Sequence, residues 1–205
     1  MPSVLYFHGF ASSPASAKIT ALRPLLEPDG ITLNTPDLNV PSFEELDFDA
    51  IVAYALEIAR REPPRAMVGS SMGALVALAV PIDVPRVLIA PALGVAAHWK
   101  EHIPSGDPVL MFNYARGEKA PIHRAFFEQI GNVRVDDEPP RSRVTVIMGR
   151  KDESVPFEAV ERTWERLEQS GKLVPGSKFI ELAEGDHGLV VHAAAIREAI
   201  VEATS

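Results

Sequence analysis

The feature that most constrains the fold of this chain is the alternation of short apolar runs with longer segments of helical periodicity. The apolar runs are mostly β-branched and bounded by glycine, proline or aspartate, which predicts strands at residues 4–7, 31–35, 66–68, 86–90, 143–148 and 178–182. Between them, apolar residues recur at spacings of three and four, which predicts helices at residues 16–26, 47–61, 71–80, 157–169 and 189–203. Such alternation is typical of an α/β fold. We therefore expect a mostly parallel sheet of about six strands with helices on both faces.

Length and composition narrow the class of protein further. With 205 residues, of which 46% are apolar, the chain is long enough for one buried core, and we expect a single domain over residues 1–205. The absence of cysteine excludes disulfides, thiolate metal sites and a cysteine nucleophile. A net charge of -8 disfavours a nucleic-acid partner, because nonspecific affinity for phosphates comes from Lys and Arg.

The apolar segments also bear on location. The N-terminus lacks the basic start and cleavage site of an export signal, and the longest apolar stretch is far shorter than the roughly 20 residues that cross a bilayer as a helix. These features predict a cytoplasmic protein without a membrane span.

A glycine-flanked serine lies where the third predicted strand gives way to a helix. Residues 69–73 read Gly-Ser-Ser-Met-Gly. A nucleophilic serine on a sharp strand-to-helix turn has a strained backbone and needs small neighbours, which Gly69 and Gly73 supply around Ser71. The motif alone occurs by chance in many chains, but here the flanking strand and helix patterns are both present. We therefore expect Ser71 to be a nucleophile.

A serine hydroxyl is a weak nucleophile and needs a base, which in turn needs an orienting carboxylate. His187 lies in a glycine-flanked loop between the last predicted strand and the last helix, and we expect it to be the base. Asp152 follows the predicted strand at residues 143–148, at the end of the strand where open α/β sheets hold their sites, and we expect it to be the acid. The order serine, aspartate, histidine is that of α/β hydrolases. Asp186 remains an alternative acid.

An acyl-transfer site also needs two backbone donors for the oxyanion of its tetrahedral intermediate. The first expected donor is the N–H of Met72, which follows the nucleophile. The second is the N–H of Phe10, in the loop after the first strand, where Gly9 lets the backbone turn towards the site. His8 precedes this loop directly, and we expect it to brace the loop rather than to act as a base.

One long segment, residues 94–138, interrupts the alternation. Its aromatic residues are Trp99, Phe112, Tyr114, Phe126 and Phe127. Long insertions in compact domains are usually functional lids or disordered, and this aromatic content favours an ordered lid. The alternative is a structural excursion whose helices pack on the edge of the core. A basic run within the segment either grips an anionic substrate group or forms a solvated surface: Arg116, Lys119, His123 and Arg124.

Three motifs together resemble a known family. Phe-His-Gly-Phe-Ala-Ser-Ser-Pro at residues 7–14, Gly-Ser-Ser-Met-Gly-Ala at residues 69–74 and Gly-Asp-His-Gly at residues 185–188 are similar to those of the YqiA-type esterases of the α/β-hydrolase superfamily. The resemblance covers nearly the whole chain. It implies a small serine esterase or thioesterase, with the triad and the oxyanion donors already named. The chain starts directly at the strand before His8, so the resemblance also implies a sheet shorter than that of the larger superfamily.

These features predict a serine hydrolase that cleaves carboxylic esters or thioesters of small to medium acyl groups through an acyl-enzyme. A triad and an oxyanion hole suffice for this chemistry, so we expect no metal and no organic cofactor. Two alternatives stay open. One is another α/β-hydrolase chemistry, such as carbon–carbon bond hydrolysis or cofactor-free perhydrolysis. The other is a ligand-binding module that keeps the fold without catalysis. The oligomeric state is not predicted.

Overall fold

A single parallel sheet forms the centre of the molecule, seen here in a computed structural model that describes residues 2–95, 102–133, 135 and 139–205. The order of its strands is β2-β1-β3-β4-β7-β8, and every neighbouring pair is parallel. The bounds are β1 Ser3–Phe7, β2 Thr32–Asn34, β3 Ala66–Ser70, β4 Arg86–Ile89, β7 Val144–Gly149 and β8 Lys178–Leu182. All six predicted strands are confirmed, with ends that differ by at most two residues.

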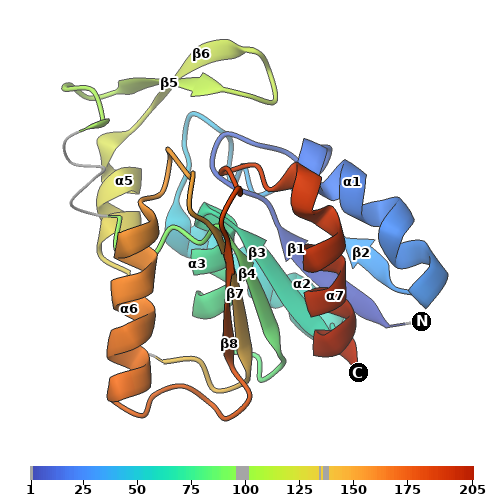
Figure 1. Ribbon diagram of the computed structural model, residues 1–205. Coiled ribbons are helices and arrows are strands. Elements are labelled where there is room, and N and C mark those ends of the chain that lie inside the picture. Colours follow the sequence, from blue (N-terminus) through green and yellow to red (C-terminus); the bar gives the residue numbers. More distant parts are fainter. Residues whose placement is uncertain (1, 96–101, 134, 136–138) are drawn as a thin grey trace.

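Helices cover both faces of this sheet (Figure 1). Helices α1 and α7 pack against each other on one face, and α3 and α6 lie on the other, where α2 contacts α3. The bounds are α1 Ala17–Leu26, α2 Phe48–Arg61, α3 Met72–Ala79, α6 Phe157–Gln169 and α7 Ala193–Thr204, with 3-10 turns at Glu27–Asp29 and Val190–His192. The predicted α/β architecture is therefore confirmed.

Burial follows from this layering. All residues of β3 and β4 are buried, which matches their mostly apolar sequence, because a parallel sheet covered on both faces has no solvated side. The helices are instead amphipathic. In α6, Phe157, Val160, Trp164 and Leu167 recur at spacings of three and four and are buried.

The connections of two adjacent strands run in opposite directions. The chain leaves β1 through α1 towards β2, whereas it leaves β3 through α3 towards β4. In open α/β sheets, such a reversal opens a crevice at the carboxyl ends of the two strands, where ligands bind. The loop after Phe7 and the turn after Ser70 both lie at this position.

The inserted segment contains a feature that the sequence did not predict. Strands β5 Val109–Asn113 and β6 Glu118–Ile122 form an antiparallel hairpin, followed by α5 Arg124–Gly131. The hairpin lies above the carboxyl ends of the main strands (Figure 1). Its two strands show no clear alternation of apolar and polar residues, and a proline within β6 argues against a strand at the sequence level. Trp99, one of the aromatic residues on which the prediction rested, lies outside the described residues.

The insertion is anchored to the loop after β1. The backbone N–H of Tyr114 donates to the carbonyl of Ala11 at 2.9 Å. The rings of Phe126 and Phe127, in α5, lie 5.8 and 5.6 Å from the ring of Phe10. The hairpin and α5 therefore contact the same loop that we expect to supply an oxyanion donor.

None of the described helices is both long enough and apolar enough to cross a membrane.

Candidate active site

Ser71 lies on a sharp turn between β3 and α3. Its backbone has φ 55° and ψ -118°, a region that residues with a side chain rarely adopt. The turn is tight enough to require glycine on both sides. A Cβ on Gly69 would lie 2.3 Å from the carbonyl oxygen of Gly73, and a Cβ on Gly73 would lie 2.2 Å from that of Phe7. The structure thus explains physically why the motif has this spacing.

Asp152 and His187 come together from two loops at the carboxyl ends of β7 and β8. The imidazole Nδ1 lies 2.8 Å from Asp152 Oδ2 and 3.1 Å from Oδ1. Because an ionised carboxylate only accepts hydrogen bonds, Nδ1 carries the proton and Nε2 is left as the basic nitrogen. The Asp152 side chain is fully buried, whereas that of His187 is 33% exposed. This pair has the arrangement of a base with its orienting acid.

The backbone holds Asp152 in place. Its Oδ1 accepts hydrogen bonds from the N–H groups of Ser154 and Val155, at 2.9 and 2.8 Å. The alternative acid, Asp186, accepts instead from the N–H of Leu189 at 2.7 Å, so it caps the turn that follows His187. The geometry favours Asp152 over Asp186 as the partner of the imidazole.

Ser71 and His187 line the same cavity, which has a volume of about 760 Å³. This is within the range of small-molecule sites. Across the described residues, no hydrogen bond joins the Ser71 hydroxyl to the imidazole. Catalytic hydrogen bonds are often long without substrate and tighten when it binds, so the shared cavity is compatible with a working pair.

The two expected oxyanion donors belong to segments next to Ser71. Gly9 lies so close that a Cβ there would be 3.3 Å from Ser71 Cβ, and the following residue, Phe10, lines the same cavity. Met72 is the first residue of α3, where a backbone N–H has no partner within the helix. The oxyanion hole itself stays a prediction.

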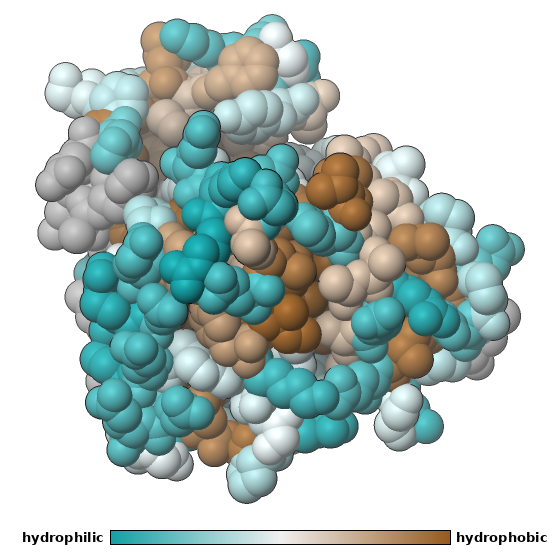
Figure 2. All heavy atoms as spheres, viewed as in Figure 1, coloured by the Kyte–Doolittle hydropathy of each residue, from teal (hydrophilic) through white to brown (hydrophobic). Residues whose placement is uncertain are grey.

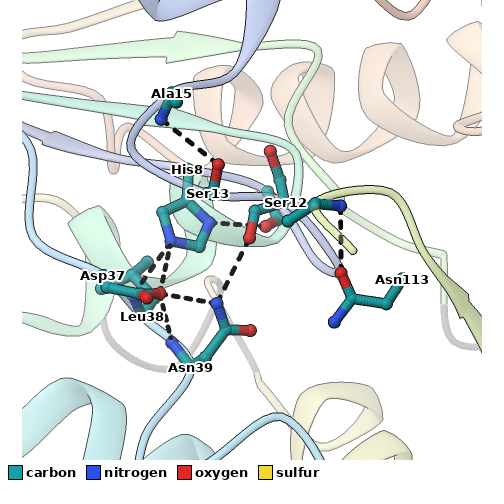
Figure 3. A network of polar contacts seen from close by, with 10 residues as sticks. His8, Ser12, Ser13, Ala15, Asp37, Leu38, Asn39 and Asn113 are labelled. Carbon is teal, nitrogen blue, oxygen red and sulfur yellow. Dashed lines mark hydrogen bonds and ion pairs between the residues drawn. The ribbon is translucent and has the colours of Figure 1, made fainter. Parts of the chain in front are cut away.

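His8 braces the loop that carries Phe10 (Figure 3). Its Nε2 accepts a hydrogen bond from the N–H of Leu38 at 2.9 Å, so the proton lies on Nδ1, which donates to the carbonyl of Gly9 at 2.9 Å. Burial lowers the pKa of His8, and the Gly9 carbonyl and Asp37 offset only part of this effect. The carbonyl of Gly9 and the N–H of Phe10 belong to one planar peptide unit. The hydrogen bond from a neutral His8 therefore fixes the orientation of the Phe10 N–H, which is the bracing role expected for His8.

Sequence reasoning missed three polar residues of the cavity wall. Tyr6, Lys18 and Ser70 all line the cavity with Ser71, and all three are buried. Tyr6 lies in an apolar strand and Lys18 in the first turn of a helix, where a lysine usually faces solvent. Only the packing of α1 against the sheet places Lys18 at the site, so no local signal could have identified it.

Two further expectations concern the basic residues of the insertion and the absence of a metal. Of the basic run in the insertion, Arg116 pairs with Glu44, and Arg124 donates to the carbonyls of Gly106 and Pro104. These partners favour a surface role for the two arginines. In the described part of the chain, no group of three or more His, Cys, Asp or Glu side chains is placed to hold a metal ion.

Solved structures with the same fold include several hydrolases. The chain superposes on the ferulic-acid-bound Est1E of Butyrivibrio proteoclasticus with a TM-score of 0.75, at 16% identity, covering 99% of this chain and 89% of that one. The esterase domain of a Rhodothermus marinus protein gives 0.70 at 21% identity, covering 98% and 85%. A thioesterase domain of the curacin biosynthetic pathway gives 0.63 at 17% identity, covering 98% and 91%. The chain therefore has the α/β-hydrolase fold.

The sequence places the chain in a family within this fold. A family model described as the uncharacterised protein family UPF0227 matches residues 3–197. The chain belongs to this family, and its expected relation to the YqiA-type α/β hydrolases is confirmed. No curated protein sequence matches the chain.

Proposed function

We propose that the protein is a serine hydrolase that cleaves carboxylic esters or thioesters of small to medium acyl groups. The observation that carries this proposal is that His187, hydrogen-bonded to the buried Asp152, lines one cavity with Ser71, itself held on a strained turn between two glycines. A nucleophile, a base and an acid of the kinds that serine hydrolysis uses, from distant parts of the sequence, support this proposal. The esterase and thioesterase names among the structural neighbours are consistent with this chemistry.

The reaction follows from the roles of these groups. Ser71 Oγ attacks the substrate carbonyl while His187 Nε2 takes the hydroxyl proton, and Asp152 stabilises the imidazolium that forms. The N–H groups of Phe10 and Met72 hold the negative oxygen of the tetrahedral intermediate. The intermediate collapses as His187 donates the proton to the leaving alcohol or thiol, which leaves an acyl group on Ser71. Water, activated by the same imidazole, then releases the acid.

This chemistry is tested by covalent labelling. A fluorophosphonate probe should phosphonylate the protein at Ser71, identified by mass spectrometry of the labelled peptide, and the protein should hydrolyse 4-nitrophenyl esters or acyl thioesters of graded chain length. A protein that neither labels nor hydrolyses any member of the panel would be a binding module. Labelling without hydrolysis of esters or thioesters would favour another α/β-hydrolase chemistry.

We further propose that the insertion at residues 94–138 acts as a lid that contacts the acyl group. Phe112 and Tyr114 line the cavity although they are 42% and 76% exposed, and their rings meet edge to face at 5.1 Å. Val190, which also lines the cavity, is 40% exposed. Figure 2 shows apolar residues both on the hairpin lobe and on the body beneath it. Exposed apolar side chains around a cavity suit an apolar substrate group.

The double variant Phe112→Ala with Tyr114→Ala should therefore change chain-length preference. We expect kcat/KM for an octanoyl ester to fall roughly 5- to 30-fold, because one or two apolar contacts of about 1–2 kcal/mol are lost. The value for an acetyl ester should change by less than about twofold, because a short acyl group does not reach the hairpin. Leu110→Ala is the matched control, since Leu110 is 59% exposed on the same strand but does not line the cavity. Equal losses for both esters, or none, would contradict the lid.

A further inference from the structure

Two cations are buried among the described residues, and they differ in what surrounds them. Arg86 donates to four backbone carbonyls, those of Ala77, Val80, Ile82 and Val84, and so closes the end of α3 and the loop after it. Lys18 instead lies at the candidate active site. Only 8% of the residue is exposed, and it lines the cavity. The role of Arg86 is structural, whereas that of Lys18 calls for another explanation.

The ammonium of Lys18 bridges three elements beside the reacting groups. Its Nζ lies 2.7 Å from Ser70 Oγ, at the end of β3, and 3.3 Å from the backbone carbonyl oxygen of His187, in the loop between β8 and α7. Ser70 directly precedes the proposed nucleophile, and His187 carries the proposed base. One side chain of α1 therefore ties the serine turn to the histidine loop, although both of its contacts avoid the reacting atoms.

The positive charge of Lys18 also acts at the candidate active site. Burial lowers its pKa to about 8, and the attraction of Asp152 and Asp186 offsets part of that effect. Titratable groups that line the same cavity are Tyr6, His8, His102, Tyr114, Glu153 and His187. The ammonium is therefore attracted to the carboxylate that holds His187, beside the loop whose carbonyl it contacts.

We infer that Lys18 is a positioning residue of the active site, which holds the His187 loop against the serine turn. This inference rests on the proposed hydrolase function. A lysine retained only for stability is a weak alternative, because replacing a buried ion by an apolar group of similar volume is often neutral or stabilising.

Lys18→Met removes both the charge and the hydrogen bonds, while its apolar stem fills the same space. We expect kcat for 4-nitrophenyl butyrate to fall roughly 10- to 100-fold with KM changed less than about threefold, because the loop moves rather than the binding cavity.

Two matched variants separate the charge from the hydrogen bonds. Lys18→Gln keeps donors without charge, so it should lose less kcat than Lys18→Met. Ser70→Ala keeps the charge and removes one anchor, so it should lower kcat modestly. Thermal unfolding of each variant shows whether it folds. If Lys18→Met does not fold, the kcat of Lys18→Gln tests the inference instead.

The outcomes are distinct. If the two Lys18 variants keep the kcat of the unchanged protein, or merely unfold at lower temperature, the inference is overturned and Lys18 is structural. If the unchanged protein fails to react with the fluorophosphonate probe, the hydrolase proposal itself fails. Labelling of the unchanged protein together with an unchanged kcat in both Lys18 variants refutes the role of Lys18 alone.

Discussion

Replacing Ser71 by alanine should lower kcat for an activated ester by roughly 10⁴-fold or more, because the reaction loses its covalent step and the remaining groups act as a unit around it. The same variant should leave the fluorophosphonate probe unattached. Stability should change little or increase, since the positive φ of Ser71 strains alanine no more than serine and the hydroxyl makes no hydrogen bond among the described residues.

The neighbouring serine is the control for this experiment. Ser70 precedes Ser71 and is also at the cavity, but its hydroxyl accepts a hydrogen bond from Lys18 and is not placed on the strained turn. Ser70→Ala should still label at Ser71 and keep most of its activity. If Ser71→Ala retained more than about a hundredth of the original kcat, the nucleophile would be another residue and the proposed mechanism would be wrong.

Replacing Gly73 by alanine should destabilise the protein by about 3 kcal/mol or more. Alanine normally stabilises a helix relative to glycine by about 1 kcal/mol, and Gly73 lies in α3. Here the sign reverses, because the new Cβ would lie 2.2 Å from the carbonyl oxygen of Phe7 and 2.5 Å from that of His8. Both obstacles are backbone atoms that cannot rotate away, so β1 and α3 must separate. Chemical denaturation with circular dichroism measures the loss.

Gly188→Ala serves as the matched comparison for stability. A Cβ there would meet its nearest atom, Asp186 Oδ1, at 3.4 Å, which is an ordinary contact with a side chain. Its free energy of unfolding should change by less than about 1 kcal/mol. A Gly73→Ala protein as stable as Gly188→Ala would show that the turn around Ser71 can relax, and the argument from close packing would not hold.

The candidate triad could be predicted because each member carries a local signal. Ser71 lies between two glycines at a strand-to-helix boundary, and Asp152 and His187 each follow a predicted strand in a loop. In a parallel sheet, such loops meet at one edge whatever the lengths of the helices between them. Strand positions and chain order therefore suffice to predict that these three residues lie at one edge of the sheet. The structure places Asp152 and His187 in contact, and His187 and Ser71 at one cavity.

The hairpin of the insertion could not be predicted in the same way. Among the described residues, β5 and β6 pair only with each other. One face of the hairpin is buried, at Val109, Ala120 and Ile122, but its exposed face carries the apolar residues Leu110 and Phe112. Because apolar residues stand on both faces, the sequence shows no period of two. The aromatic content predicted an ordered segment, but not its secondary structure.

The sequence by itself determined the strands of the sheet and the candidate catalytic residues. Periodicity identified the six strands, and the residues that follow them identified the proposed nucleophile, base and acid. Only the tertiary structure decided which polar side chains surround that site. Lys18 reaches Ser70 and the carbonyl of His187 across 52 and 169 residues of sequence, and His8 braces the Gly9 peptide through Leu38, 30 residues away. Local sequence patterns indicate which face of its own helix or strand a residue occupies. Which other residue it contacts depends on how the helices and strands pack, and that packing is a property of the whole fold.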